Sequence, residues 1–220
     1  MSFKWKLAQW LELHWWKHYF AGKDKGAYYH WKRNYWNQLL STISDVVKLH
    51  PNDSVAEVGC GPAGIFVALQ AKDVIAIDPL LEQYESTLPF FKKADFPNVK
   101  FVNSPIESYS ASKRFHKVFC MNAINHVSDI QSAFDVLENI TAENGQLIVS
   151  IDAHNFKAFK ILFRLIPGDA LHPHQYDLAE YCQFLESRGF QVSRIEKLKA
   201  EFFFNHYVLV ANRINPQSHQ

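Results

Sequence analysis

The sequence predicts an α/β protein with a doubly wound, mostly parallel β-sheet, an antiparallel last strand and an N-terminal helical extension. From residue 54 onward, short apolar runs alternate with amphipathic stretches, as in successive βαβ units. Near the C-terminus, two β-rich runs at 190–195 and 202–211 are joined by a short polar link, which only antiparallel neighbours permit. A glycine-rich segment at 57–64 stands between a predicted strand and a predicted helix, where such folds bind ligands.

The composition is that of an ordinary globular protein. The chain has 220 residues, of which 48% are hydrophobic and 20% are charged, and it contains no internal repeat or long linker. We expect one main domain over residues 51–212, a helical cap over residues 1–50 and a flexible tail over residues 213–220.

The N-terminal segment differs in composition from the rest. Residues 1–36 hold all six tryptophans and seven Lys or Arg against two acidic residues, a charge of +5. Large residues recur at helical spacing from Phe3 to His14, a break follows at 22–26, and a second helix is predicted over 28–49. Three interpretations stay open for this segment: packing against the sheet, a lid over an acceptor pocket, or an interfacial anchor on an anionic membrane.

The elements that follow are predicted in this order. Strands are expected at residues 54–58, 73–77, 99–102, 117–121 and 146–151, before the two closing strands. Helices are expected at 65–71, 80–92, 130–140 and 178–187, with Asn144-Gly145 as a turn or helix stop before the fifth strand and Gly189 after the last helix.

The cysteines, the absence of long apolar runs and the charge distribution indicate where the protein is located and which partners it binds. Cys60, Cys120 and Cys182 form no CxxC pair and are odd in number, which favours a reducing cytoplasm over a disulfide framework. We see neither a secretory signal nor an apolar span long enough for a membrane helix. Nucleic-acid binding is not expected, because the chain beyond residue 36 carries a net charge of −4 and no basic stripe.

The glycine-rich segment and one acidic residue together predict a nucleoside site. Gly59 and Gly61 allow a tight turn and a close backbone approach, and Gly64 allows the helix to pack near the strand. Asp78 ends the next predicted strand, 19 residues after Gly59, where a carboxylate accepts both ribose hydroxyls.

Two cofactor classes share this pattern, and Glu57 separates them. A dinucleotide places its pyrophosphate at the helix N-terminus, where a nearby carboxylate would repel it. Glu57 comes just before the loop, so a ligand that carries positive charge is favoured.

The run from Glu57 to Gly64 resembles the first motif of the class I S-adenosylmethionine-dependent methyltransferases, acid-x-Gly-x-Gly-x-x-Gly. The resemblance covers about residues 53–212 and implies a Rossmann-like, seven-stranded sheet that binds S-adenosylmethionine. It places the loop, with Cys60, under the methionine portion of the cofactor. The residues that it places around the rest of the cofactor are Asp78 on the ribose, Pro79 beside the adenosine, Ser104 and Ile106 at the adenine, and Asn122 at the methionine end. Ser104 departs from the family pattern, which has an Asp followed by a small or apolar residue there.

Methyl transfer needs mainly alignment and exclusion of water, and a base helps if the acceptor is a hydroxyl or an acidic carbon. His126, and His174 in the segment His172-Pro173-His174, are the candidate bases; each could instead cap a helix. His172-Pro173-His174 resembles a segment that borders the acceptor pocket of small-molecule methyltransferases. No metal site is expected, because the pair lacks a third ligand at convincing spacing.

The leading hypothesis is therefore an S-adenosylmethionine-dependent methyltransferase acting on an unidentified small-molecule or lipid acceptor. One alternative is an NAD-dependent oxidoreductase, but no Tyr-x-x-x-Lys arrangement follows the fifth strand. The other is a non-catalytic binding or scaffold protein that uses the N-terminal segment as its working surface.

Overall fold

The computed structural model describes residues 3–155 and 176–214, with side chains from residue 5 onward. Within these residues, seven strands form one sheet in the order β3-β2-β1-β4-β5-β7-β6. The strands are β1 (Ser54–Val58), β2 (Asp73–Asp78), β3 (Val99–Asn103), β4 (Phe115–Cys120), β5 (Thr141–His154), β6 (Phe190–Ala200) and β7 (Phe204–Arg213). Neighbours from β3 to β5 pair in parallel, whereas β7 runs antiparallel to β5 and β6, which confirms the predicted fold.

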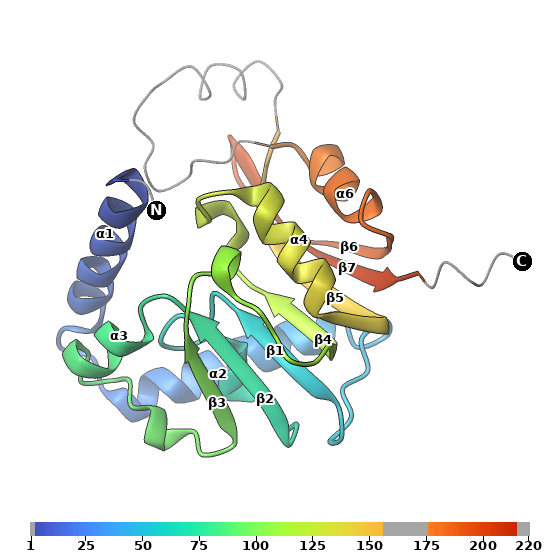
Figure 1. Ribbon diagram of the computed structural model, residues 1–220. Helices are drawn as coiled ribbons and strands as arrows, with labels where there is room; N and C mark the ends of the chain where they lie inside the picture. Colours follow the sequence, from blue (N-terminus) through green and yellow to red (C-terminus); the bar gives the residue numbers. More distant parts are fainter. Residues whose placement is uncertain (1–2, 156–175, 215–220) are drawn as a thin grey trace, which may run out of the picture.

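Helices cover both faces of the sheet (Figure 1). On one face, α2 (Lys25–Thr42) packs with the residues around α3 (Leu81–Thr87), and Trp36 and Tyr84 belong to this core. On the other face, α4 (Ile130–Ile140) and α6 (Leu178–Glu186) bury Phe134 and Leu185. The sheet is thus sandwiched between two apolar layers, as in other doubly wound folds.

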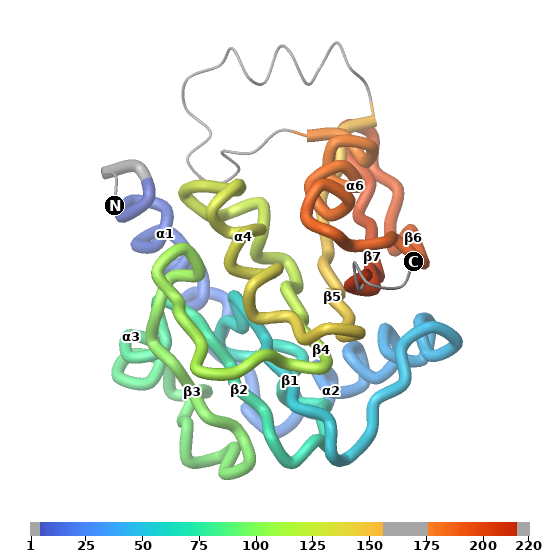
Figure 2. The backbone as a smooth tube through the Cα atoms, turned by 45° about the vertical axis from the view of Figure 1, so that its right-hand side comes forward, coloured from blue at the N-terminus to red at the C-terminus, as the bar shows by residue number. Residues whose placement is uncertain are grey.

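The first helix, α1 (Phe3–Phe20), lies beside α3 near the β3 edge of the sheet (Figures 1 and 2). Phe20 is buried and stacks on Phe90, with 4.4 Å between ring centroids. This contact ties the end of α1 to the segment that follows α3.

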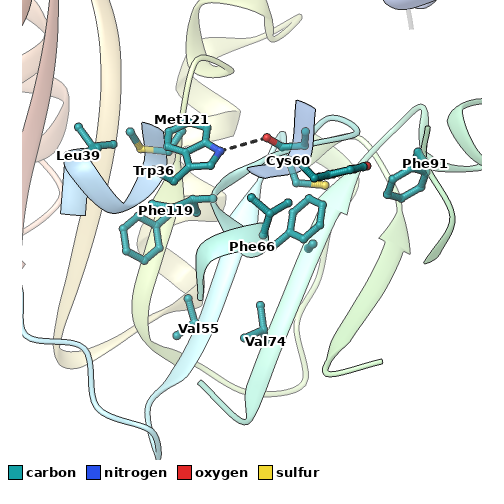
Figure 3. Close-up of a cluster of buried hydrophobic side chains, with 14 of the residues drawn as sticks. Trp36, Leu39, Val55, Cys60, Phe66, Val74, Phe91, Phe119 and Met121 are labelled. Atoms are coloured by element: carbon teal, nitrogen blue, oxygen red, sulfur yellow. Dashed lines mark hydrogen bonds between the residues drawn. The ribbon is translucent and has the colours of Figure 1, made fainter. Parts of the chain in front are cut away.

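Helix α2 braces the second half of the glycine-rich loop. The Trp36 Nε1–H donates to the Ala63 carbonyl at 3.1 Å (Figure 3), and the Tyr29 hydroxyl donates to the Pro62 carbonyl at 2.9 Å. Both side chains are buried, so each bond satisfies a carbonyl that has left the strand ladder. Part of the aromatic content of the N-terminal segment therefore serves to hold this loop.

Three predicted helices end several residues earlier in the structure than the sequence indicates. The helix expected at 65–71 is a single 3₁₀ turn, Ile65–Ala68, because its β-branched and aromatic residues favour a helix poorly. The helix expected at 80–92 ends at Thr87, since Pro89 holds Leu88 in an extended conformation. The helix expected at 28–49 spans Lys25–Thr42.

Other boundaries also differ from the predictions. The end of α2 coincides with Thr42 and Ser44, whose hydroxyls donate to backbone carbonyls and compete with further helical turns. Asn144-Gly145 lies inside β5 and does not stop a helix: β5 begins at Thr141, and its register against β4 shifts at this point. None of the helices described is long and apolar enough to cross a membrane.

Candidate cofactor site and acceptor groove

A cavity opens at the carboxyl ends of β1, β2 and β4, and it contains about 570 Å³ of empty space. This is the usual place for a ligand in an open parallel sheet. Its lining includes Trp5, Gln9, Glu12, Gly59, Asp78, Pro79, Ser104, Ile106, Glu107, Asn122, Ala123, His126 and Val127. Seven of the residues predicted from the sequence are therefore gathered around one cavity.

The glycine-rich loop needs its glycines for backbone reasons. Gly59 and Gly61 have φ values of 69° and 55°, in the left-handed region that other residues avoid. A Cβ on Gly59 would also lie 2.2 Å from the Cβ of Ala123. Gly59 thus lets the loop approach the segment after β4, and this approach closes the floor of the cavity.

Glu57 does not line the cavity, in contrast to the expectation that its carboxylate would face the ligand. It is fully buried, and its two carboxylate oxygens accept the Ile65 N–H at 2.7 Å and the Phe66 N–H at 2.8 Å. Burial raises the pKa of Glu57 to about 8, although these two amides and nearby Lys32 favour the charged form. Glu57 therefore occupies the amide donors that a pyrophosphate would otherwise use.

Asp78 lies at the end of β2 with only 5% of its surface exposed. Its carboxylate accepts the Gly61 N–H at 2.9 Å and the Leu80 N–H at 2.8 Å. Burial and the neighbouring Glu12 carboxylate raise the pKa of Asp78 to about 7. Glu12 is held in place by the Tyr84 hydroxyl, which donates to it at 2.8 Å.

Pro79, Ser104 and Ile106 form the wall that the resemblance assigns to the adenosine. The Ser104 hydroxyl donates to the Pro105 carbonyl at 2.9 Å, and Ile106 is buried in the core beside β4. The wall is mostly apolar, which suits the face of a purine ring.

Asn122 follows β4 with a φ of 54°, a conformation that Asn tolerates better than most residues. Its N–H donates to the Ser150 hydroxyl at 2.6 Å, and that hydroxyl donates back to the Asn122 side-chain oxygen at 3.1 Å. β5 therefore fixes the orientation of this residue. His126 is at the end of the next turn, also on the cavity wall.

Two predicted loop residues, Cys60 and Gly61, are not on the cavity wall. Cys60 is buried and belongs to the apolar core, and burial raises the pKa of its thiol. Gly61 reaches the site through its N–H on Asp78 and does not line the cavity. His174 lies outside the described residues.

Helix α1 supplies Trp5, Gln9 and Glu12, which the sequence analysis did not assign to the cofactor site. The tryptophan-rich composition was the only sequence signal, and it left three interpretations open. The contact between α1 and the cavity depends on tertiary packing against α3, which local periodicity does not reveal.

The cavity lining suits a nucleoside that carries positive charge. It combines three carboxylates, Asp78, Glu12 and Glu107, with apolar side chains, and the lining residues described include no Lys or Arg. S-adenosylmethionine has ribose hydroxyls, a purine ring, a sulfonium and an ammonium group, so its chemistry fits these donors and acceptors. The phosphates of NAD would meet these carboxylates and the amides already bonded to Glu57.

A second, larger groove adjoins this cavity. It contains about 1220 Å³ of empty space and lies between α2 and the β6–β7 hairpin. Its lining comprises Tyr35, Gln38, Leu39, Thr42, Asn122, Glu196, Lys197, Leu198, Lys199, Glu201 and His206. Asn122 lines both spaces, so a molecule in the groove would meet the cavity at this residue.

Comparison with known proteins agrees with this geometry. A family model described as a methyltransferase domain matches residues 28–195. A ubiquinone biosynthesis O-methyltransferase of Rickettsia typhi is 24% identical over 206 residues, which cover 81% of this chain and 82% of the relative.

Solved structures of methyltransferases share the fold at low sequence identity. Magnesium protoporphyrin IX methyltransferase from Synechocystis PCC 6803, with bound SAH, superposes with a TM-score of 0.60 at 16% identity and covers 90% of this chain and 92% of its own. The 1,6-didemethyltoxoflavin-N1-methyltransferase of Burkholderia thailandensis, with bound S-adenosylhomocysteine, gives 0.61 at 14% identity and covers 98% and 92%. Because the family model spans most of the chain, this protein belongs to the methyltransferase domain family, and it is a class I S-adenosylmethionine-dependent methyltransferase.

Proposed function

We propose that the protein transfers a methyl group to a hydroxyl oxygen of a small-molecule or lipid-like acceptor bound in the groove. The observation that carries this proposal is the meeting of cavity and groove at Asn122. The α2 side of the groove presents Tyr35 and Leu39, which suit an apolar or aromatic acceptor. The name of the Rickettsia typhi relative supports oxygen as the atom methylated.

The cavity residues would hold and shield the methyl donor. The Asp78 carboxylate accepts the ribose hydroxyls, the apolar wall of Pro79 and Ile106 packs on the purine, and Asn122 aligns the methionine end with the groove. S-adenosylmethionine supplies the activated methyl group when it is bound. Trp5 and Gln9 of α1 exclude water from the reacting atoms.

His126 and His174 stay proposals for acceptor contacts. His126 is on the cofactor-cavity wall and close in sequence to Asn122, which supports a place near the methionine end. For His174 the support is its segment's resemblance to the border of an acceptor pocket.

Methyl transfer from radiolabelled S-adenosylmethionine tests the proposed acceptor chemistry. We would offer 4-hexylcatechol, 4-hexylaniline and 4-hexylbenzenethiol, which share an apolar tail and differ in the accepting atom. The proposal predicts that label is transferred to the oxygen of the catechol, as located by mass spectrometry. Label on only the nitrogen or sulfur acceptor would contradict it, as would no transfer by protein that binds the cofactor.

We also propose that α1 contacts an anionic membrane surface from the cytoplasmic side. Trp10 and Trp15 are 53% and 55% exposed, and Lys6 and Lys17 on the same helix are exposed as well. Amphipathic aromatic rings beside lysines favour the interface of anionic lipid. The cytoplasmic location is supported by the cysteines, since Cys60, Cys120 and Cys182 are free thiols.

Co-sedimentation with phosphatidylglycerol vesicles tests this contact. The double variant Trp10→Ala/Trp15→Ala should sediment less than the wild type. Ile195→Ala, an exposed apolar residue on β6 at the opposite edge of the sheet, is the matched control and should bind as the wild type does. Equal binding of all three proteins would show that α1 is not the contact.

A further inference from the structure

His206 lies on the wall of the groove between two carboxylates, at a position that no sequence motif marks. On β7 it pairs directly with Asp152 on the neighbouring strand β5. Its Nδ1 contacts Asp152 Oδ1, and its Nε2 lies 3.5 Å from Glu201 Oε2. The His206 side chain is 33% exposed, so a molecule in the groove can reach it.

The sheet register places this pair close to the meeting point of cavity and groove. Ser150 comes two residues before Asp152 on β5, so both side chains project from the same face, separated by about 7 Å along the strand. The Ser150 hydroxyl bonds to Asn122. The His206–Asp152 pair is therefore separated from Asn122 by about the spacing between Ser150 and Asp152 on β5.

Asp152 is held in place by the segment that also lines the cofactor cavity. The Asp152 N–H donates to the Asn125 side-chain oxygen at 3.3 Å, and the Asn125 side-chain N–H donates to the Asp152 carbonyl at 3.2 Å. Asn125 is itself buried and donates to the Tyr181 hydroxyl at 2.9 Å. The end of β5 is therefore preorganised relative to the turn after β4.

We propose that His206 is the general base that removes the proton from the acceptor hydroxyl, and that Asp152 is its positioning residue. This inference rests on the proposed O-methyl transfer. Asp152 accepts the Nδ1–H, which directs the lone pair to Nε2, on the groove side of the ring and 3.5 Å from Glu201 Oε2. No other histidine described combines a carboxylate on one ring nitrogen with a place on the groove wall.

Proton removal by His206 accompanies the transfer of the methyl group to the acceptor oxygen. The acceptor O–H bond breaks and its proton moves to Nε2 of His206. The oxygen electron pair forms the new bond to the methyl carbon while the carbon–sulfur bond breaks, and its electron pair stays on sulfur. Asp152 and Glu201 stabilise the resulting imidazolium, which then releases the proton to solvent through the open groove.

Two acceptors of different acidity test the role of His206 in the full-length protein. With 4-hexylcatechol, His206→Asn should lower kcat about 100-fold or more, the usual contribution of a general base. With 4-nitrocatechol, whose acidic hydroxyl ionises near neutral pH, the loss should be under about tenfold because little proton removal is needed. Asp152→Asn should show the same split by favouring the wrong tautomer, and Asp152→Glu should restore part of the rate.

Controls separate this role from a structural one. Calorimetry with S-adenosylmethionine should give unchanged affinity for His206→Asn, which shows that the variant is folded. His30→Asn, on the exposed side of α2, is the matched histidine control and should keep full activity.

Equal losses of kcat on both catechols would overturn the inference. So would unchanged kcat in His206→Asn together with a strongly reduced kcat in His126→Asn. A wild-type protein that binds cofactor but methylates neither catechol would instead refute the proposed O-methyl transfer, and the base assignment with it.

Discussion

Asp78 is the residue whose ionisation should control cofactor binding. Its pKa is raised to about 7 by burial and by Glu12, so the carboxyl group is partly protonated near neutral pH. The charged form accepts hydrogen bonds from both ribose hydroxyls, whereas the protonated form loses acceptor capacity. Cofactor affinity should therefore rise as the pH increases through this range.

Calorimetric titration with S-adenosylmethionine at about pH 5.5 and about pH 8 checks this prediction. We expect tighter binding at the higher pH. Glu12→Gln removes the neighbouring charge and so lowers the pKa of Asp78. The increase of cofactor affinity with pH should therefore occur at lower pH in this variant than in the wild type. Affinity that falls with increasing pH would contradict the assigned role of Asp78.

The buried carboxyl group of Glu57 should make the stability of the protein depend on pH. Burial raises the pKa of this group in the folded protein to about 8 from the ordinary value of 4.5. Between these two pH values, Glu57 is protonated in the folded state and ionised in the unfolded state. The free energy of unfolding should therefore decrease as the pH rises through this range. Urea unfolding at about pH 5.5 and about pH 8 should give a lower midpoint at the higher pH.

Glu57→Gln tests the origin of this pH dependence. The amide group places a donor against the Ile65 or Phe66 N–H, so the variant should be less stable by about 1–3 kcal/mol. It should also show a flatter change in stability between the two pH values. A midpoint that drops with pH as steeply as in the wild type would assign the effect to other groups.

At the scale of elements, the glycine-rich loop depends on a close approach between Gly59 and Ala123. Gly59→Ala combines backbone strain with a collision of two Cβ atoms, so it should reduce both stability and cofactor affinity. Gly189→Ala is the matched control: its φ is 74°, against 69° for Gly59, but nothing lies within 4 Å of the added Cβ. It should cost only the strain, about 1–2 kcal/mol, and leave cofactor affinity unchanged.

A compensating variant separates the collision from the strain. Gly59→Ala/Ala123→Gly removes the opposing Cβ and should recover part of the cofactor affinity measured by calorimetry. Failure of this double variant to recover any affinity would mean that the close approach does not form the floor of the site.

The elements also show which parts of the structure the sequence could predict. The alternation of strands and helices gave the sheet, and α4 at Ile130–Ile140 begins and ends as expected, because Asp129 caps it and its apolar face is strongly periodic. The end of α3 was also open to prediction, since Pro89 is a local signal. The early start of β5 at Thr141 was not, because it depends on the register with β4.

At the scale of the whole molecule, the site combines residues that local patterns cannot bring together. Gly59, Asp78 and Asn122 lie at the carboxyl ends of three neighbouring strands, so the sheet order alone gathers them at one edge. Glu12 and His206, in contrast, come from a helix and a strand at opposite ends of the chain. Their places depend on tertiary packing and on antiparallel register, which no short motif encodes.

The whole molecule also explains the choice of cofactor. Glu57 occupies the amides of Ile65 and Phe66 just after the loop, while Asp78 of β2 and Glu12 of α1 make the cavity acidic. An anionic dinucleotide is disfavoured because these amides are occupied and because the cavity carboxylates repel phosphate. The same carboxylates favour a cationic nucleoside.

Calorimetric titration of the full chain with S-adenosylmethionine, for the wild type and Asp78→Ala, tests whether this cavity binds the cofactor through Asp78. We predict that the wild type binds S-adenosylmethionine and not NADH, and that Asp78→Ala weakens the affinity by about tenfold or more through the loss of charged hydrogen bonds. Unchanged affinity in Asp78→Ala, or binding of NADH alone, would contradict the assignment of this cavity.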